Sequence, residues 1–129
     1  MKMYHLSYDG LITELHNVDV WSKWYDEFVG SGKHVIRNDV IKHYNCDITV
    51  STVFLGLDHN FNNVHEEPIL FETMIFGGEL NEDQWRWTTK EKAKAGHNLV
   101  VQMVLNHPHH INYDKPQKEN GRLKRMMDM

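Results

Sequence analysis

Apolar side chains recur with a helical period in two stretches of the chain. The first stretch places four of them on one face of a helix that we predict over 19–29: Val18, Trp21, Tyr25 and Phe28. Gly30 suits the left-handed position that ends a helix. In the second stretch, Thr88 and Glu91 have the spacing of a capping box, and Pro108 cannot continue a helix. The inward face of this second helix would carry Ala93, Gly96, His97, Val100 and Val104.

Between the two helical stretches, β-branched and apolar residues predict extended structure. We expect three longer strands, over 34–44, 47–57 and 69–76. The short link at 45–46 and the loop over 58–67 favour antiparallel neighbours in a meander. An Asp9-Gly10 turn would join two shorter strands at 3–6 and 11–13. The sequence therefore predicts an α+β fold, an antiparallel meander of three to five strands with two helices packed on it.

Composition narrows the class of protein. The chain has 129 residues, enough for one compact domain, and 40% of them are hydrophobic, as in an ordinary soluble globular protein. No apolar run approaches the roughly 20 residues that a membrane-spanning helix needs. The first residues lack the apolar core of a secretory signal. Cys46 is the one cysteine, which excludes an internal disulfide and fits a reducing compartment, so we expect a cytoplasmic protein.

Charge divides the chain into two parts. The formal net charge is −4, so generic nucleic-acid binding is not expected. Nine basic and fifteen acidic residues lie in 1–110, which we interpret as a single α+β domain, and five basic and three acidic residues lie in 111–129, a basic C-terminal tail. A sheet whose strands are apolar on both faces needs a packed layer on each face, and few helices are predicted. A homodimer is therefore also expected.

Three blocks of sequence are similar to a known group of small proteins. They are 51–61 (STVFLGLDHNF), 70–78 (LFETMIFGG) and 86–97 (RWTTKEKAKAGH). In order and spacing these blocks resemble a small family that is common in bacteriophage and prophage genomes and has no established activity. The resemblance implies a phage origin and carries over no catalytic residues. Trp87 stands where the family usually has tyrosine, and the tail beyond Pro108 departs from the family's pattern.

An Asp-His pair follows the predicted central strand. Asp58 and His59 would bind a divalent metal or act as a base and its orienting group, since rigid scaffolds present functional loops at strand ends. The alternative is a polar loop in which Asp58 and Asn60 cap their own turn.

Two more titratable groups interrupt apolar patterns. If 57 pairs with 68, Glu72 lies opposite Val53, where it would either form an ion pair with Arg86 or His97 or serve as a catalytic acid. His97 lies on the apolar side of the last helix, as a core residue bonded to a strand or to Glu72, or as a ligand.

Two local clusters complete the candidates. An extended Trp85-Arg86-Trp87 segment puts both indoles on one side and Arg86 on the other, which suits a nucleobase with its phosphate, or an indole cover at the core edge. The weak candidates for metal binding are His107, His109 and His110. The chain has no phosphate-binding loop and no cysteine pair for zinc, so we expect no cofactor.

These features favour a non-enzymatic phage accessory protein in the host cytoplasm. It would bind a host protein or a small nucleotide signal, and so assist takeover or inhibit defence. A small metal-dependent hydrolase or nuclease is the first alternative and requires four residues to converge: Asp58, His59, Glu72 and His97. A minor virion component is the second, and it would place the tail against another subunit.

Overall fold

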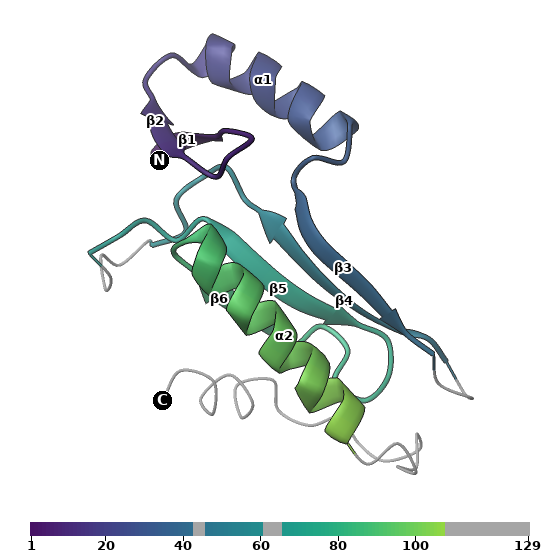
Figure 1. Cartoon of the computed structure of the whole chain (residues 1–129). Coiled ribbons are helices and arrows are strands. Elements are labelled where there is room, and N and C mark those ends of the chain that lie inside the picture. The colour runs from purple at the N-terminus through teal and green to yellow at the C-terminus, as the bar shows by residue number, and fades with distance from the viewer. Residues whose placement is uncertain (43–45, 61–65, 108–129) are drawn as a thin grey trace.

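The computed structural model describes residues 1–42, 46–60 and 66–107, which form two antiparallel sheets and two helices (Figure 1). In chain order the elements are β1 (Met3–Leu6), β2 (Ile12–Leu15), α1 (Val18–Gly30), β3 (Val35–Ile41), β4 (Ile48–Phe54), β5 (Phe71–Phe76), β6 (Gln84–Trp87) and α2 (Lys90–Asn106). β1 and β2 form a hairpin, and the other strands form a meander in the order β3-β4-β5-β6. The predicted α+β fold and antiparallel meander are confirmed. The predicted tail, 111–129, lies outside the described residues.

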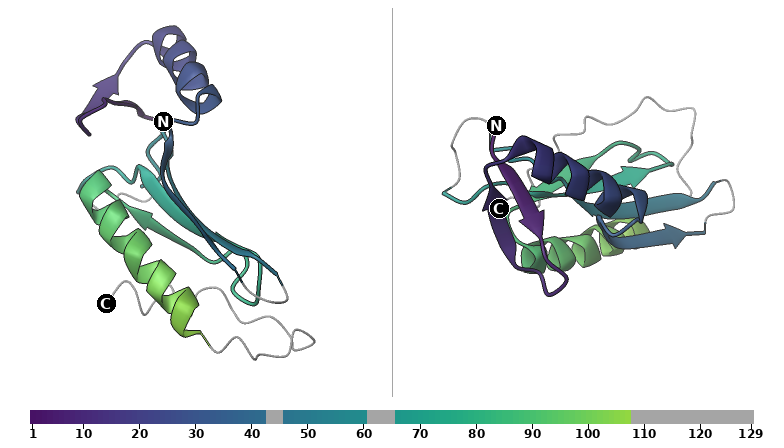
Figure 2. Two further views of the ribbon diagram at one scale, coloured as in Figure 1. Left: turned by 45° about the vertical axis from the view of Figure 1, so that its right-hand side comes forward. Right: turned by 90° about the horizontal axis from the view of Figure 1, so that it is seen from above.

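α2 covers one face of the four-stranded sheet (Figure 2). Alternate residues of β4 are buried beneath it, and its own buried residues are the five of the predicted face: Ala93, Gly96, His97, Val100 and Val104. Gly96 lies where helix and sheet approach most closely. A Cβ atom at this position would lie 2.2 Å from Cζ2 of Trp87, so the packing requires glycine.

α2 begins one residue later than the predicted capping box implies. Its N-cap is Thr89, whose backbone is extended and whose Oγ1 accepts a hydrogen bond from the backbone N–H of Lys92 at 3.1 Å. Thr88 instead accepts a bond from the Lys92 ammonium group at 3.4 Å. The cap prediction was wrong by one position because two adjacent threonines have the same capping chemistry, and the backbone conformation selects between them.

α1 and the β1–β2 hairpin form a second layer at one end of the sheet (Figures 1 and 2). The Trp21 indole N–H donates to the carbonyl of Tyr4 at 2.9 Å, and the Tyr25 hydroxyl donates to the carbonyl of Leu55 at 3.0 Å. Gly56 has a φ of +80° beneath Tyr25, whose ring would clash with any Cβ there. Of the two helices, therefore, α2 packs on the meander, and α1 packs on the hairpin and the end of β4.

Two apolar clusters hold these layers together. The first fills the space between α2 and the middle of the sheet: Ile48, Val50, Ile75, Leu80, Trp85, Val100 and Val104. The second joins the hairpin to α2 and to the end of the four-stranded sheet nearest the hairpin: Tyr4, Leu6, Phe54, Leu70, Phe71 and Ala93. α1 reaches the second cluster with Trp24 and Phe28, yet no residue of α1 is fully buried. Within the described ranges, neither helix has the length and apolar character of a membrane-spanning segment.

Candidate functional site

Asp58 and His59 lie in the bend that follows β4, and both are occupied by local backbone groups. One Asp58 carboxylate oxygen accepts the N–H groups of Asn60 at 2.8 Å and Ile69 at 2.9 Å. The Nδ1 atom of His59 lies 2.8 Å from the carbonyl of Leu57. The carboxylate thus closes its own turn and attaches it to the residue before β5, as the structural alternative from the sequence requires.

Glu72 and His97 lie on opposite faces of the sheet. Glu72 is opposite Val53 in the strand register, on the face away from α2, and its carboxylate accepts the Arg86 Nε–H at 3.0 Å. His97 approaches the other face from α2. The four residues of the hydrolase alternative therefore do not converge, and residues 1–42, 46–60 and 66–107 contain no group of three or more side chains able to hold a metal ion.

The Trp85-Arg86-Trp87 segment is part of the core. Its side chains alternate as predicted, with Arg86 on the face of Glu72. Trp85 is only 1% exposed, however, and the Trp87 ring lies against Gly96 while its N–H donates to Thr73 at 2.9 Å. Trp85 therefore has no free face on which a base would stack, and the two indoles pack at the core as the alternative interpretation from the sequence proposes.

The histidines after α2 are only partly described. His107 follows the last residue of α2, and its Nε2 atom lies 3.3 Å from a carboxylate oxygen of Glu79. The other two predicted metal candidates, His109 and His110, lie outside the described residues.

A buried chain of hydrogen bonds, which we call the His97 network, links α2 to all four strands of the meander. The Trp87 N–H donates to the Thr73 hydroxyl, which lies 2.6 Å from the Thr52 hydroxyl. Thr52 in turn lies 2.7 Å from His97 Nδ1, and His97 Nε2 lies 2.6 Å from the Asp39 carboxylate. Because the carboxylate can only accept, we assign the proton of the His97 ring to Nε2, and Nδ1 is then an acceptor. Every bond is satisfied when each group donates to the next, from the Trp87 N–H through Thr73 and Thr52 to His97 Nδ1.

The His97 network has the residue types of a hydrolytic triad but not the access. Thr52, Thr73 and His97 are completely buried between α2 and the sheet, so no substrate can reach the Thr52 hydroxyl. Only the Asp39 end is exposed to solvent. The network therefore fixes α2 to the sheet, as the structural alternative for His97 proposes.

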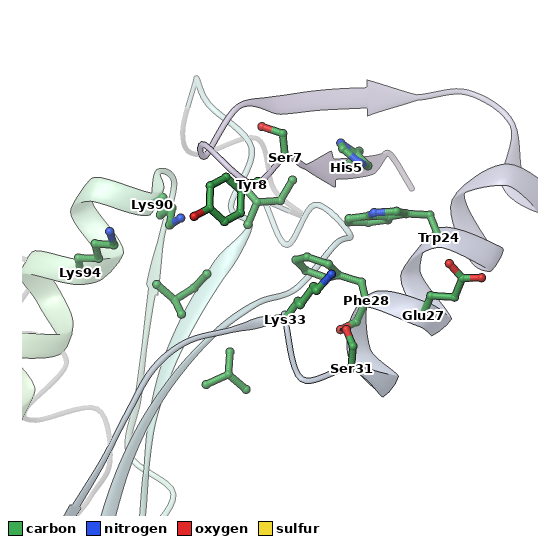
Figure 3. Close-up of a pocket in the computed structure, with 13 residues that line it drawn as sticks. His5, Ser7, Tyr8, Trp24, Glu27, Phe28, Ser31, Lys33, Lys90 and Lys94 are labelled. Carbon is green, nitrogen blue, oxygen red and sulfur yellow. The ribbon is translucent and has the colours of Figure 1, made fainter.

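A cleft of about 740 Å³ opens between the N-terminal layer and the first turns of α2 (Figure 3). We call it the lysine cleft. Its lining comes from the β1–β2 hairpin, from α1, from the link into β3 and from α2: His5, Leu6, Ser7, Tyr8, Trp24, Glu27, Phe28, Ser31, Lys33, Val35, Ile36, Lys90 and Lys94. Its volume lies within the range of ordinary small-molecule sites.

One side of the lysine cleft is aromatic. The Trp24 ring lies against Phe28, with centroids 4.6 Å apart, and against His5 at 4.4 Å. Phe28 also meets the edge of Phe54, which is fully buried and holds the group in place. Across the cleft, the fully exposed Tyr8 extends from the hairpin loop towards Lys90 (Figure 3).

The other side of the lysine cleft is cationic. Lys33, Lys90 and Lys94 line it together with a single acid, which gives a formal net charge of +2 in a chain whose total is −4. None of the three lysines forms an ion pair within the described part of the chain. In Figure 3 the Glu27 carboxylate lies beyond Phe28, on the side away from Lys90 and Lys94.

The position of α2 adds to this positive potential. Lys90 is the first residue of the helix and lines the cleft, so the positive end of the α2 dipole lies beside the cleft. Nearby, the pKa of the Asp9 carboxyl is held below its ordinary value, first by the Ser7 hydroxyl that donates to it and, to a smaller extent, by the charge of Lys90. The cleft thus combines apolar rings with positive charge.

Sequence reasoning did not identify the lysine cleft. Two signals for it were present: Lys90 and Lys94 are one helical turn apart, and α1 carries Trp24 in addition to the predicted apolar stripe. Comparisons with protein-family models, with curated proteins and with solved structures find no match. A functional assignment therefore rests on the chemistry of the cleft, and the family resemblance stays a prediction.

Proposed function

We propose that the protein binds a nucleotide in the lysine cleft and does not transform it. The observation that carries this proposal is the convergence of Lys33, Lys90 and Lys94 on a cavity with an aromatic wall. Lys33 lies more than fifty residues before Lys90 and Lys94 in the chain. None of the three lysines forms an ion pair among the described residues. Such an arrangement fits a ligand that is anionic at one end and planar at the other.

The phosphate end of the ligand would lie between the three lysines and the first turn of α2. Ammonium groups act on phosphate as point charges, and helix N-termini favour anions because their N–H groups are unpaired.

The base would stack on the aromatic side. Tyr8 is fully exposed, so its ring makes no core contact and is available as a stacking surface. Trp24 and Phe28 present an apolar wall opposite. Base–aromatic stacking typically contributes about 1–3 kcal/mol per base.

The biological setting is part of the proposal. A phage accessory protein in the host cytoplasm would use such a cleft to sequester a small nucleotide signal. The dispersal of Asp58, Glu72 and His97 supports binding without catalysis, because no acid, base and metal set forms among them. Three features suggest the phage origin: the sequence blocks at 51–61, 70–78 and 86–97.

A thermal-shift and calorimetric series tests the proposal. The probes are mononucleotides and cyclic dinucleotides, with the matching nucleosides and inorganic phosphate as comparisons. A nucleotide at 100 times its dissociation constant is expected to add about 2.7 kcal/mol to the free energy of unfolding. Because both ends of the ligand contribute, nucleoside and phosphate alone should bind more weakly than the nucleotide.

Matched variants locate the site. Lys33→Ala and Lys94→Ala should each weaken nucleotide binding, whereas Lys23→Ala, which removes an exposed lysine of α1 outside the cleft, should not. Tyr8→Ala should weaken binding and Tyr8→Phe should retain it, because the ring provides the stacking surface. No response to any nucleotide, or equal losses in Lys23→Ala and Lys33→Ala, contradicts the proposal.

A further inference from the structure

The four-stranded sheet has one long open edge. β3 is its outermost strand and pairs with β4 alone within the described residues, and most of its side chains are exposed. Figure 1 shows no described element beside it. The opposite edge, β6, is only four residues long. Proteins seldom leave a seven-residue edge unprotected, because its free N–H and C=O groups are a template for another strand.

The sequence of β3 is its own complement when reversed. It runs Val-Ile-Arg-Asn-Asp-Val-Ile, with Asn38 at the centre. An antiparallel copy aligned on Asn38 places Arg37 opposite Asp39 of the partner subunit, and Asp39 opposite Arg37 of the partner subunit. Apolar residues flank this centre on both sides. Opposite charges directly across from each other stabilise a strand pair, and like charges destabilise it.

The same pattern excludes the neighbouring registers. A shift of the pair by two positions places either Arg37 opposite Arg37 of the partner subunit or Asp39 opposite Asp39 of the partner subunit. Charges on an edge strand ordinarily prevent pairing with arbitrary strands. Here the charges permit pairing with a second copy in one register, because Arg37 and Asp39 lie at equal distances on either side of Asn38 and carry opposite charges.

We infer that two copies of the chain pair antiparallel through β3, about a twofold axis at Asn38. The product is a continuous eight-stranded sheet with an isologous interface. β3 bears a bulge between Val35 and Arg37, and its regular part runs from Arg37 to Ile41, which includes both charged residues.

The charged groups at the centre retain bonding capacity for this partner. Arg37 and Asp39 pair with Thr52 and Val50, so both lie on the face of the sheet that α2 covers. Asp39 is 54% exposed and accepts one bond from His97, which leaves its other oxygen for a guanidinium group. Arg37 donates Nη1 to Asn98 at 3.1 Å and has further N–H groups to offer.

Exposed apolar groups border the edge on both faces of the sheet. On the α2 side, Leu105 lies two helical turns beyond Asn98 on the same helix face and is half-exposed. On the other side, Val40 is 49% exposed. A paired copy would cover both, which adds apolar area to the strand hydrogen bonds. The three lysines of the cleft come from one chain, so the inference does not depend on the proposed function.

Sedimentation velocity on the full chain and on charge-swapped variants tests the inference. The wild type is expected at twice its mass of 15.3 kDa. Arg37→Asp alone and Asp39→Arg alone each put like charges opposite each other, so each should raise the dimer dissociation constant at least about tenfold. An equimolar mixture of these two variants restores opposite charges in both pairs and should dimerise, as should the double variant R37D/D39R.

Val40→Lys is a second test variant, and it leaves the His97 network intact. If Asp39→Arg fails to fold, the result with Val40→Lys tests the inference in its place. Val40→Lys should dissociate the dimer, because a lysine on an edge strand opposes pairing. Val20→Lys, at an exposed valine of α1, should remain dimeric. The inference is overturned by a monomeric wild type at the highest attainable concentration, by single variants that stay dimeric, or by a mixture that stays monomeric.

Discussion

α2 carries two groups of polar side chains that differ in how they are satisfied. In the His97 network, the buried hydroxyl groups of Thr52 and Thr73 and both ring nitrogens of His97 have partners in the protein, and these three residues are completely buried. In the lysine cleft, a few residues away along the same helix, Lys90 is partly exposed and Lys94 exposed, and neither forms an ion pair among the described residues. Satisfied polar groups fix a structure, whereas unsatisfied ones that solvent can reach remain available to a ligand.

Removing the centre of the His97 network is expected to have the largest effect on stability. His97→Ala leaves a cavity under α2 and unpairs the buried Thr52 hydroxyl, so the free energy of unfolding should fall by about 3–5 kcal/mol. Leu99→Ala, at an exposed position of the same helix, should change it by less than about 0.5 kcal/mol. Urea unfolding measures both. Similar losses in the two variants would show that the network does not hold α2 to the sheet.

Gly96→Ala should have the next largest effect. The added methyl group meets the rigid Trp87 ring at 2.2 Å, and relief of this clash should cost about 1–3 kcal/mol. Gly30 has open space around it, so Gly30→Ala serves as the control and should not destabilise the protein. The comparison is made by urea unfolding, with tryptophan fluorescence as a second signal. A neutral Gly96→Ala would contradict the close approach of helix and sheet.

The cleft lysines should show the opposite behaviour. Lys94→Ala is expected to change the free energy of unfolding by less than about 0.5 kcal/mol, because the ammonium group is solvated and unpaired. The same variant should lose nucleotide affinity in calorimetry. Destabilisation of several kcal/mol without a change in affinity would assign Lys94 to the structure and not to a ligand site.

The smallest expected effect concerns Asp9 at the rim of the lysine cleft. The Ser7 hydroxyl stabilises the ionised form, so the pKa of this carboxyl in the folded protein lies below its ordinary value of 3.8. A depressed pKa stabilises the fold above pH 3.8, and this contribution is lost as the pH falls through the lower folded value. Ser7→Ala should raise the midpoint in a carboxyl NMR titration, and Lys90→Ala should raise it less. An unchanged midpoint in Ser7→Ala would show that the Ser7 hydroxyl is not what lowers the pKa of Asp9.

The parts of the fold that depend on local periodicity could be predicted from the sequence. The buried face of α2 follows from a 3.6-residue repeat, and the pairing of Glu72 with Val53 follows from antiparallel pairing of consecutive strands with 57 opposite 68. Even the Glu72–Arg86 ion pair was among the predicted alternatives, because adjacent strands of a meander bring such residues together.

The candidate site could not be predicted in the same way. The lysine cleft brings a hairpin loop at Tyr8, one face of α1 at Trp24 and the start of α2 at Lys90 into one place. No short-range pattern encodes the approach of three segments that lie so far apart in the chain. Conversely, the Trp85-Arg86-Trp87 segment has the composition of a stacking site, but its register against β5 turns both indoles into the core.

The shallow seating of α1 has a consequence for how the cleft would open and close. α1 supplies one wall through Trp24 and Phe28, yet none of its residues is fully buried, whereas α2 buries five. Helices held by few buried contacts undergo local unfolding more readily than the core, so amide hydrogens of α1 should exchange with solvent before those of α2. A ligand bound between the two helices would then order α1, and the loss of conformational entropy would reduce its binding free energy. Residence time would accordingly be governed by the fluctuations of this one helix.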